Sequence, residues 1–322
     1  MSWAEPWPPG VLLHPPSDDP AFATCLAIVV ILAAVSVVGL AVVTSRGRGG
    51  ASAGTLWARW LTWVVLASLF TLASFSGLLP VAVLLGLFAL QGTREWATLL
   101  DLPNVHRRLL AADSVLAMAL SLFGAVALLA TVPLLLLVGM LQPVVGADTR
   151  RGMRDLAFGA LGFAYLPLLL AFGVLLVRDR PDGAAILFVV AAMAGFSDIG
   201  AYVVGKSVGR RPLAPTLSPN KTLEGVAGNF LGAAVAAVLF ASIAPLEAAG
   251  LAVLVVIVAL AAVWGDLFKS ALKREVGVKD AGTLLPGFGG LLDRVDSLIV
   301  ALPLVYYALG AGDLMAGNGT AA

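Results

Sequence analysis

The feature that most constrains this chain is a succession of apolar stretches, most of them ~20 residues long. A helix of ~20 apolar residues spans the ~30 Å hydrocarbon core of a bilayer. Of the 322 residues, 60% are hydrophobic and 12% are charged, and the mean hydropathy is +0.99. Soluble domains do not have this balance, and a β-barrel would show short alternating segments instead. The sequence therefore predicts an all-α, polytopic integral membrane protein.

The apolar stretches predict about nine to ten transmembrane helices. The fourth and fifth are short for a full crossing, and Pro133 near their junction is also compatible with a hairpin that does not fully cross. The candidate spans are approximately 21–43, 56–76, 79–99, 113–128, 130–141, 155–177, 184–204, 225–244, 247–271 and 297–312.

The first span stands apart from the others. Residues 1–54 combine an acidic, Pro-rich tail, the apolar stretch 21–43 and a linker rich in Gly and Arg. No Lys or Arg precedes that stretch, and it is too long for the apolar region of a signal peptide, so we expect it to be retained. Residues 55–312 are expected to form one membrane domain, followed by a short polar tail at 313–322.

Lys and Arg are concentrated in alternate loops, those that follow the odd-numbered spans. Loops rich in these residues stay on the cytoplasmic side of a membrane. We therefore expect these loops to face the cytoplasm from the inner (cell) membrane, with both chain ends on the opposite side.

One strongly polar segment, residues 265–297, interrupts the apolar pattern. Acids and bases alternate in it around a Gly-rich turn at 286–290, which cannot be regular helix. Carboxylates suit Mg²⁺, and bases neutralise phosphate oxygens. A solvated loop between two spans would not need so many opposed charges, so the segment predicts a site for a metal ion and phosphates.

The spacing of the polar residues places several of them together. Four of them, at i, i+3, i+4 and i+7, would share one face of a helix. They are Asp266, Lys269, Ser270 and Lys273. Asp293 and Asp296 open the next apolar stretch. For Asp296 alone, capping of that helix is the simpler interpretation.

A second polar segment lies upstream, at residues 197–225. Asp198 lies in an apolar stretch, where an ionisable group is costly and usually functional, although a hydrogen bond to a neighbouring helix is the alternative. Lys221 and Thr222 come just before the next helix, whose N-terminus attracts anions. Glu224 is expected to support that terminus as a capping box with the preceding loop.

Three further features have structural interpretations. Residues 200–207 match the P-loop pattern, but the motif needs a preceding strand, and here it ends an apolar helix. Trp96 is interpreted as an interfacial aromatic residue. The single cysteine, Cys25, cannot form an intramolecular disulfide.

Together, the two polar segments resemble the signature of the phosphatidate cytidylyltransferases (CDP-diacylglycerol synthases). The matching sequences are SALKREVGVKDAGTLLPGFGGLLDRVD at 270–296 and SDIGAYVVGKSVGRRPLAPTLSPNKTLEG at 197–225. The resemblance covers about residues 56–312 and leaves the first span outside. It implies that CTP is joined to the phosphate of phosphatidic acid, giving CDP-diacylglycerol and pyrophosphate, with Mg²⁺ and room for a second cation.

The resemblance also implies roles for single residues. Asp266 and Asp293 would hold the metal, and Lys273 would complete the catalytic set. Further matching positions would bind substrate or phosphate: Ser218, Lys221, Thr222, Arg274, Lys279 and Arg294. The supporting acidic positions are Asp198, Asp280 and Asp296.

Two positions depart from the family pattern. The family usually has Glu where Lys269 stands and His where Phe288 stands. An ammonium one helical turn from Asp266 is expected either to weaken cation binding or to pair with that carboxylate directly. The pattern of the usual enzyme is therefore altered inside the site itself.

Several other functions are compatible with the residues. One is a related enzyme that activates a different lipid phosphate, and another is a non-catalytic lipid-binding descendant. A transporter would also carry polar residues within its spans, but no inverted repeat is visible in this sequence. The expected partners are CTP, phosphatidic acid or a related lipid phosphate, and membrane lipid, with no nucleic acid. A homodimer is compatible with the sequence, which does not fix the oligomeric state.

Overall fold

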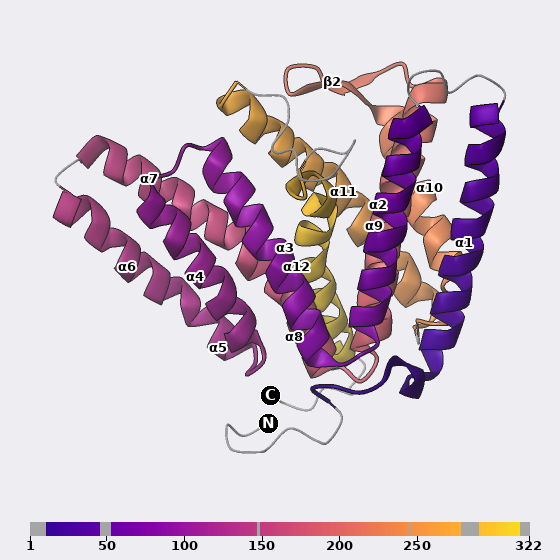
Figure 1. Ribbon diagram of the computed structural model, residues 1–322, viewed down its shortest axis with the longest axis horizontal. Coiled ribbons are helices and arrows are strands. Elements are labelled where there is room, and N and C mark those ends of the chain that lie inside the picture. Colours follow the sequence, from indigo (N-terminus) through magenta and orange to yellow (C-terminus); the bar gives the residue numbers. More distant parts are fainter. Residues whose placement is uncertain (1–10, 46–52, 147–148, 245, 278–289, 316–322) are drawn as a thin grey trace.

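The computed structural model describes residues 11–45, 53–146, 149–244, 246–277 and 290–315 (Figure 1). Its regular elements are helices except for one antiparallel two-stranded hairpin. A 3₁₀ turn at Pro16–Asp18 precedes the first helix. In chain order, the elements that follow are α1 (Pro20–Ser45), α2 (Ala53–Ser74), α3 (Leu78–Leu99), α4 (Asn104–Ser121), α5 (Ala125–Leu129), α6 (Thr131–Gly146), α7 (Thr149–Phe163), a π-helical turn (Ala164–Leu168), α8 (Leu169–Asp179), α9 (Gly183–Val208), β1 (Pro212–Ala214), β2 (Ser218–Thr222), α10 (Leu223–Leu239), α11 (Ala248–Glu275) and α12 (Leu292–Met315).

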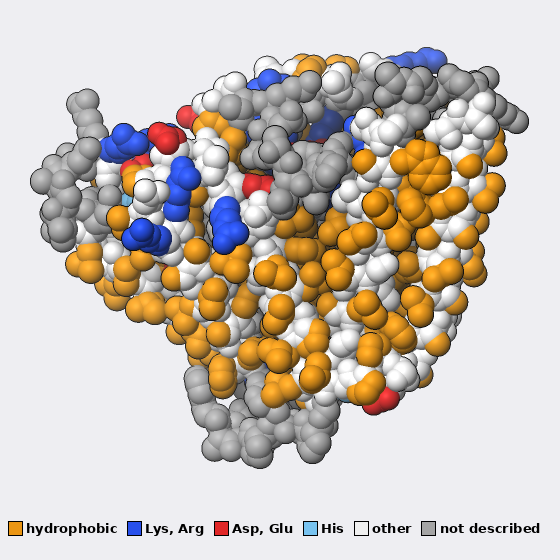
Figure 2. Space-filling model, viewed as in Figure 1, with side chains coloured by type: hydrophobic (Ala, Val, Ile, Leu, Met, Phe, Trp, Pro, Cys, Tyr) orange, Lys and Arg blue, Asp and Glu red, His pale blue; other side chains and the backbone are white. Residues whose placement is uncertain are grey.

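The helices confirm an integral membrane protein. In the part of the chain that the structure describes, seven helices are long and apolar enough to cross a membrane. Shorter apolar helices occur at Ala125–Leu141 and Leu223–Leu239, and the number of nine to ten spans stays a prediction. Hydrophobic side chains cover most of the face seen in Figure 2, while Lys and Arg lie toward its upper part. Large apolar side chains point outward on many helices, as expected where helices contact lipid.

The fourth and fifth apolar stretches differ from the predicted pair of spans. The helix predicted at 113–128 is α4, which begins at Asn104 and ends at Ser121. Gly124 then turns the chain with a φ of +114°, a conformation that glycine adopts without strain. The short α5 and then α6 follow. The turn between the two apolar stretches therefore lies at Gly124, earlier than expected. Pro133, which marks their junction in the sequence-based prediction, falls inside α6.

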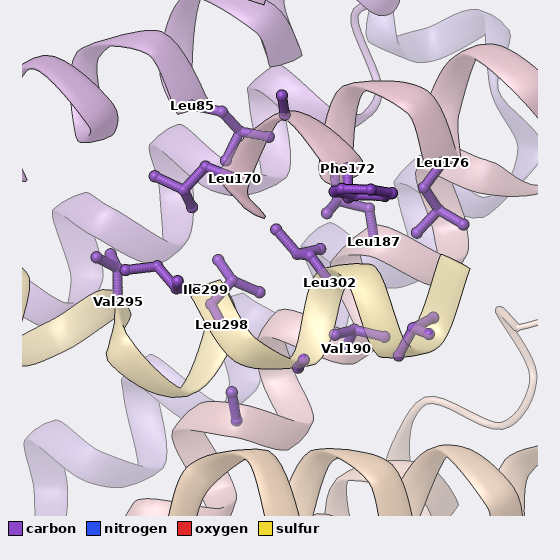
Figure 3. Packing of buried hydrophobic residues seen from close by; sticks show 14 of the residues in the cluster. Leu85, Leu170, Phe172, Leu176, Leu187, Val190, Val295, Leu298, Ile299 and Leu302 are labelled. Atoms are coloured by element: carbon purple, nitrogen blue, oxygen red, sulfur yellow. The ribbon is translucent and has the colours of Figure 1, made fainter. Parts of the chain in front are cut away.

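The core lies where α3, α8, α9 and α12 meet (Figure 3). Ile299 and Leu302 of α12 point toward apolar side chains of the other helices and are fully buried. Their surroundings include Leu170 of α8 and Leu187 of α9, which are 0% and 1% exposed. This packing fixes α12, whose first turns carry Asp293 and Asp296, against the rest of the molecule.

The helices α9 and α10 approach each other closely through small residues. A Cβ atom on Gly232 would lie 2.0 Å from the carbonyl oxygen of Phe196. Such close backbone contact is typical of small residues between membrane helices. The P-loop look-alike at residues 200–207 lies wholly within α9, which confirms that it is not a P-loop. After α9, the β1–β2 hairpin crosses the upper end of the bundle and leads into α10 (Figure 1).

Candidate active site

The site begins at the contact between α11 and α12. A Cβ atom on Gly265 would lie only 2.5 Å from the backbone oxygen of Asp296, so only glycine permits this approach. The next residue, Asp266, and Lys269 one turn later therefore lie directly against the start of α12. The predicted shared face of α11 is confirmed for Asp266, Lys269 and Lys273. Asp266 pairs with Lys221 of the hairpin and with Lys269 on the same face, and the two lysines of α11 pair with acids of α12. Ser270 instead donates a hydrogen bond to the backbone oxygen of Asp266, at 2.7 Å.

Lys269 is the centre of the cluster. Its ammonium nitrogen lies 2.6 Å from Oδ2 of Asp296, 3.2 Å from Oδ1 of Asp293 and 3.4 Å from Oδ1 of Asp266. The residue is only 6% exposed. A buried charge is tolerated when it is paired and hydrogen-bonded, and here three carboxylates surround one ammonium. The predicted direct pairing of Lys269 with Asp266 is present, and two more partners accompany it.

The position of Asp296 corrects one interpretation. The helix α12 begins at Leu292, so Asp296 lies inside it and does not cap it. Its carboxylate is 3% exposed; besides Lys269, it accepts a hydrogen bond from the backbone N–H of Ser297, at 2.9 Å. The acid in the first turn of α12 is Asp293.

Two more lysines complete the charge balance. The Lys273 ammonium lies 3.1 Å from Oδ1 of Asp293. Lys221, from the end of strand β2, forms an ion pair with Asp266. Arg274 donates from Nε to the backbone oxygen of Leu217, at 3.2 Å. Lys221 and Arg274 thus hold the hairpin above the α11–α12 contact.

The start of α10 is capped, though not quite as predicted. Oγ1 of Thr222 accepts a hydrogen bond from the Gly225 N–H at 3.0 Å, which is ordinary N-cap geometry. The Glu224 carboxylate reaches backwards and accepts from the backbone N–H groups of Arg210 and Arg211, at 3.0 and 3.2 Å. These hydrogen bonds hold the pKa of Glu224 below its usual range. Glu224 therefore contacts the preceding loop, as expected, but it accepts from the N–H groups of Arg210 and Arg211, whereas a capping box would use the N–H of the N-cap residue, Thr222.

Asp198 approaches the cluster from α9. Its Oδ1 lies 3.5 Å from the Ser297 hydroxyl, and the neighbouring Ser197 accepts a hydrogen bond from Nδ2 of Asn229, at 3.0 Å. The alternative interpretation of Asp198, a hydrogen bond to a neighbouring helix, is therefore present, because Ser297 belongs to α12. Ser197 makes the contact to α10, and Asp198 faces the cluster.

A cavity of about 330 Å³, called the polar cleft below, brings these segments together. Several predicted positions line it: Asp198, Lys221, Thr222, Asp266, Asp293, Arg294 and Asp296. Ser218, Lys273 and Arg274 lie at the surrounding elements and are not among its lining residues. Lys279, Asp280 and Phe288 fall outside the described residues.

A second cavity, called the apolar cavity below, has a volume of about 460 Å³. Its walls come from α1, α2, α3, α9 and α12 and are almost entirely hydrophobic, with Trp60 and Trp63 among them. Nε1 of Trp60 donates a hydrogen bond to Ser36 of α1, at 2.9 Å. Asp198 and Arg294 line both cavities. An amphipathic molecule could therefore place an apolar part in one cavity and a charged part in the other.

The cleft fits a metal ion on its open side. Among the described residues, no group of three or more His, Cys, Asp or Glu side chains could hold a metal by itself. The Asp266 side chain is 39% exposed, whereas those of Asp293 and Asp296 are 6% and 4% exposed. Mg²⁺ is commonly bound by one or two carboxylates together with substrate phosphates. That arrangement suits an exposed Asp266 at the edge of the cleft.

One residue that positions the site was not identified from the sequence. Glu95 of α3 is 6% exposed and accepts hydrogen bonds from the backbone N–H groups of Leu291 and Leu292, both at 2.9 Å. These N–H groups lie at the start of α12 and have no partner within the helix. Glu95 therefore fixes the helix end that carries Asp293. An acid at the end of an apolar span was the only available signal.

The neighbouring Trp96 was also misinterpreted. It is 0% exposed and donates from Nε1 to the backbone oxygen of Phe158, at 3.0 Å. The interfacial interpretation is wrong because α7 and the π-helical turn cover this end of α3. The ring of Tyr165 from that turn lies between Trp96 and Phe268 of α11, with centroid distances of 6.0 and 4.7 Å.

Comparison with known proteins identifies the family. Residues 57–311 match the cytidylyltransferase family. A phosphatidate cytidylyltransferase of Bacillus subtilis strain 168 is 38% identical over 157 residues, which are 48% of this chain and 58% of that protein. The corresponding enzyme of Mycobacterium leprae is 36% identical over 159 residues, 49% of this chain and 51% of that protein.

A third relative has no assigned activity in its name. It is the uncharacterized protein YnbB of Escherichia coli K12, 40% identical over 126 residues, or 39% of this chain and 42% of that protein. The matched regions span about half the length of these relatives. The family match covers all of the residues that line the polar cleft and leaves α1 outside. The chain belongs to the cytidylyltransferase family.

Proposed function

We propose that this protein joins CTP to the phosphate of a membrane lipid, phosphatidic acid, and releases CDP-diacylglycerol and pyrophosphate. The observation that carries the proposal is the junction of two unlike cavities at Asp198 and Arg294. A lipid phosphate has the same two parts, apolar chains and an anionic head. The names of the relatives from B. subtilis and M. leprae support this substrate.

In the proposed reaction, a lipid phosphate oxygen bonds to the α-phosphorus of CTP. The bond from that phosphorus to the oxygen bridging the β-phosphate breaks, and pyrophosphate leaves with the electron pair. Such transfers depend on positioning and charge neutralisation more than on covalent help from the protein. The groups needed are therefore cationic side chains with fixed positions.

The described residues supply these groups from three directions. Lys221 comes from the hairpin, and Lys273 comes from α11. Arg294 lines both cavities, so it is placed for the lipid phosphate that enters from the apolar side. We assign Lys221 and Lys273 to the phosphates of CTP and Arg294 to the lipid. Ser218, Thr222 and Arg274 hold the hairpin and the start of α10 around them.

We further propose that Mg²⁺ is required, with Asp266 and Asp293 as its carboxylates. Mg²⁺ would neutralise charge on the triphosphate and favour departure of pyrophosphate. Asp266 fits because it is the most exposed acid of the cluster. Asp293 would act from behind it, on the buried side of the same cluster.

The direct test uses purified protein in lipid nanodiscs with labelled CTP, Mg²⁺ and phosphatidic acid. We expect labelled CDP-diacylglycerol and pyrophosphate in equal amounts. Polyprenyl phosphate and an ether-linked lipid phosphate, tested in parallel, decide whether a related lipid is the substrate. No labelled lipid from any of the three would contradict the proposed transferase function.

The polar cleft is proposed to face the cytoplasm, because Lys and Arg are concentrated in the loops at this end. Thr216, at the exposed turn of the hairpin, offers a test. In a Cys25→Ser background, Thr216→Cys is expected to react with an impermeant maleimide in inside-out vesicles and not in intact cells. Labelling in intact cells would reverse the orientation.

A further inference from the structure

The three-carboxylate cluster contains its own cation. Asp266, Asp293 and Asp296 converge on one point between α11 and α12, and the Lys269 ammonium lies there. We propose that Lys269 is a fixed internal cation that takes the place of an exchangeable metal ion between α11 and α12. The protein would then bind a single divalent cation, on the open side of Asp266.

The geometry matches an ammonium group. Lys269 has three N–H donors, and four oxygens lie within 2.6 to 3.4 Å of its nitrogen: one from each of the three carboxylates and the backbone oxygen of Asp293. Mg²⁺ needs about six oxygen ligands at ~2.1 Å and usually keeps several waters. The point between the helices is nearly closed, since Lys269 is 6% exposed and Asp296 is 3% exposed. An ammonium fills this space without a hydration shell.

The charges lead to the same inference. Three carboxylates face three lysines, so the cluster of Asp266, Asp293 and Asp296 with Lys221, Lys269 and Lys273 is formally neutral. Lys221 and Lys273 each contact one carboxylate, whereas Lys269 contacts all three. Removing the charge of Lys269 would leave a net negative charge where the carboxylates are closest. That is the condition under which a buried acidic cluster binds a metal ion.

The proposal makes the two sides of the cluster distinguishable. Both carboxylates line the cleft, but the Asp266 side chain is 39% exposed at its open edge, whereas the Asp296 side chain is 4% exposed at its buried end. A cation bound on the open side depends on Asp266 and is insensitive to Asp296. A cation that displaces Lys269 depends on both carboxylates. The number of bound cations, and which carboxylates their binding requires, therefore show whether the exchangeable site lies on the open side of Asp266 or at the position of Lys269.

The experiment counts Mn²⁺ bound to the full chain in nanodiscs, by titration calorimetry and by the electron paramagnetic resonance signal of free Mn²⁺. It uses no nucleotide and no turnover, so its outcome is independent of whether the proposed transferase reaction occurs. In the unaltered protein, we expect one Mn²⁺ per chain. Its affinity should fall at least tenfold in Asp266→Asn and stay within twofold in Asp296→Asn.

The variant Lys269→Gln should gain one additional Mn²⁺ per chain, and Asp296→Asn in that background should remove it. Lys269→Arg keeps the charge and should gain none. Lys206→Gln is the matched control, because Lys206 lies on the exposed end of α9 beside Tyr202 and outside the cluster. The proposal is overturned if Lys269→Gln binds no additional Mn²⁺. It is also overturned if the unaltered protein binds two Mn²⁺, or if it binds one that is lost in Asp296→Asn. These two measurements do not use Lys269→Gln, so they test the proposal even if that variant does not fold.

Discussion

The polar cleft and the apolar cavity share Asp198 and Arg294, yet they are built in opposite ways. The cleft takes charged groups from α9, the hairpin, α11 and α12, and those of the hairpin and of the two last helices form ion pairs with one another. The apolar cavity is enclosed mainly by α1, α2 and α9, with few polar atoms. Under the proposed function, phosphate chemistry would belong to the cleft and lipid binding to the apolar cavity, and the two would meet at these two residues.

The two cavities also differ in their relation to the family. The residues of the cleft fall within the segment that matches the cytidylyltransferases. Part of the apolar cavity is formed by Val29, Leu32, Ala33 and Ser36 of α1, which lies outside that segment. Changes in the cleft should therefore alter the reaction itself, whereas changes in α1 should alter which lipids are accepted.

The largest effect is expected from the acids of the cleft. Asp266→Asn and Asp293→Asn keep the side-chain shape and remove a negative charge. We expect each to lower turnover at least ~10²-fold, the scale found for groups that stabilise charge in a transition state. Initial rates with labelled CTP measure this effect.

Asp101→Asn is the control for these variants, because Asp101 is an exposed acid that is paired with Arg151 and does not line the cleft. Its rate should stay near that of the unaltered protein. Near-normal turnover in both Asp266→Asn and Asp293→Asn would remove the proposed catalytic roles.

A smaller, selective effect is expected from filling the apolar cavity. Ala33→Trp places a large ring into the wall formed by α1. The KM for a long-chain lipid phosphate should rise ~10-fold, the scale of discrimination by apolar pockets, while the KM for CTP should not change. Ile31→Trp is the control, since Ile31 is 59% exposed on the same helix. Equal changes in the two KM values would contradict the separation of the cavities.

The smallest effect is expected at the cap of α10. Thr222→Ala removes the acceptor for the Gly225 N–H and should cost ~1 kcal/mol of stability. Thr222→Ser keeps the hydroxyl and should cost little. Thermal unfolding in nanodiscs measures the difference. Because the cap borders only the polar cleft, the KM for CTP should change more than the KM for the lipid, and the reverse result would contradict this arrangement.

Local sequence patterns predicted much of the fold. Long apolar runs fix helices by composition alone, and the i, i+3, i+7 spacing correctly placed Asp266, Lys269 and Lys273 on one face. The same spacing could not show that Asp296 lies opposite Lys269, because that contact depends on how two helices cross. Glu95 illustrates the limit further. Its partners, Leu291 and Leu292, are almost two hundred residues away in the chain, and nothing in the sequence around Glu95 indicates them.

The contact at Gly265 sets the distance between α11 and α12 in the site. The separation of α11 from α12 is set at one point, where a hydrogen atom meets the backbone oxygen of Asp296. The lengths of the ion pairs that bridge the two helices, including those of Lys269 and Lys273, depend on this separation. A single methyl group at position 265 would therefore lengthen several ion pairs at once. The cluster therefore keeps its ion pairs only while the side chain at position 265 is no larger than a hydrogen atom.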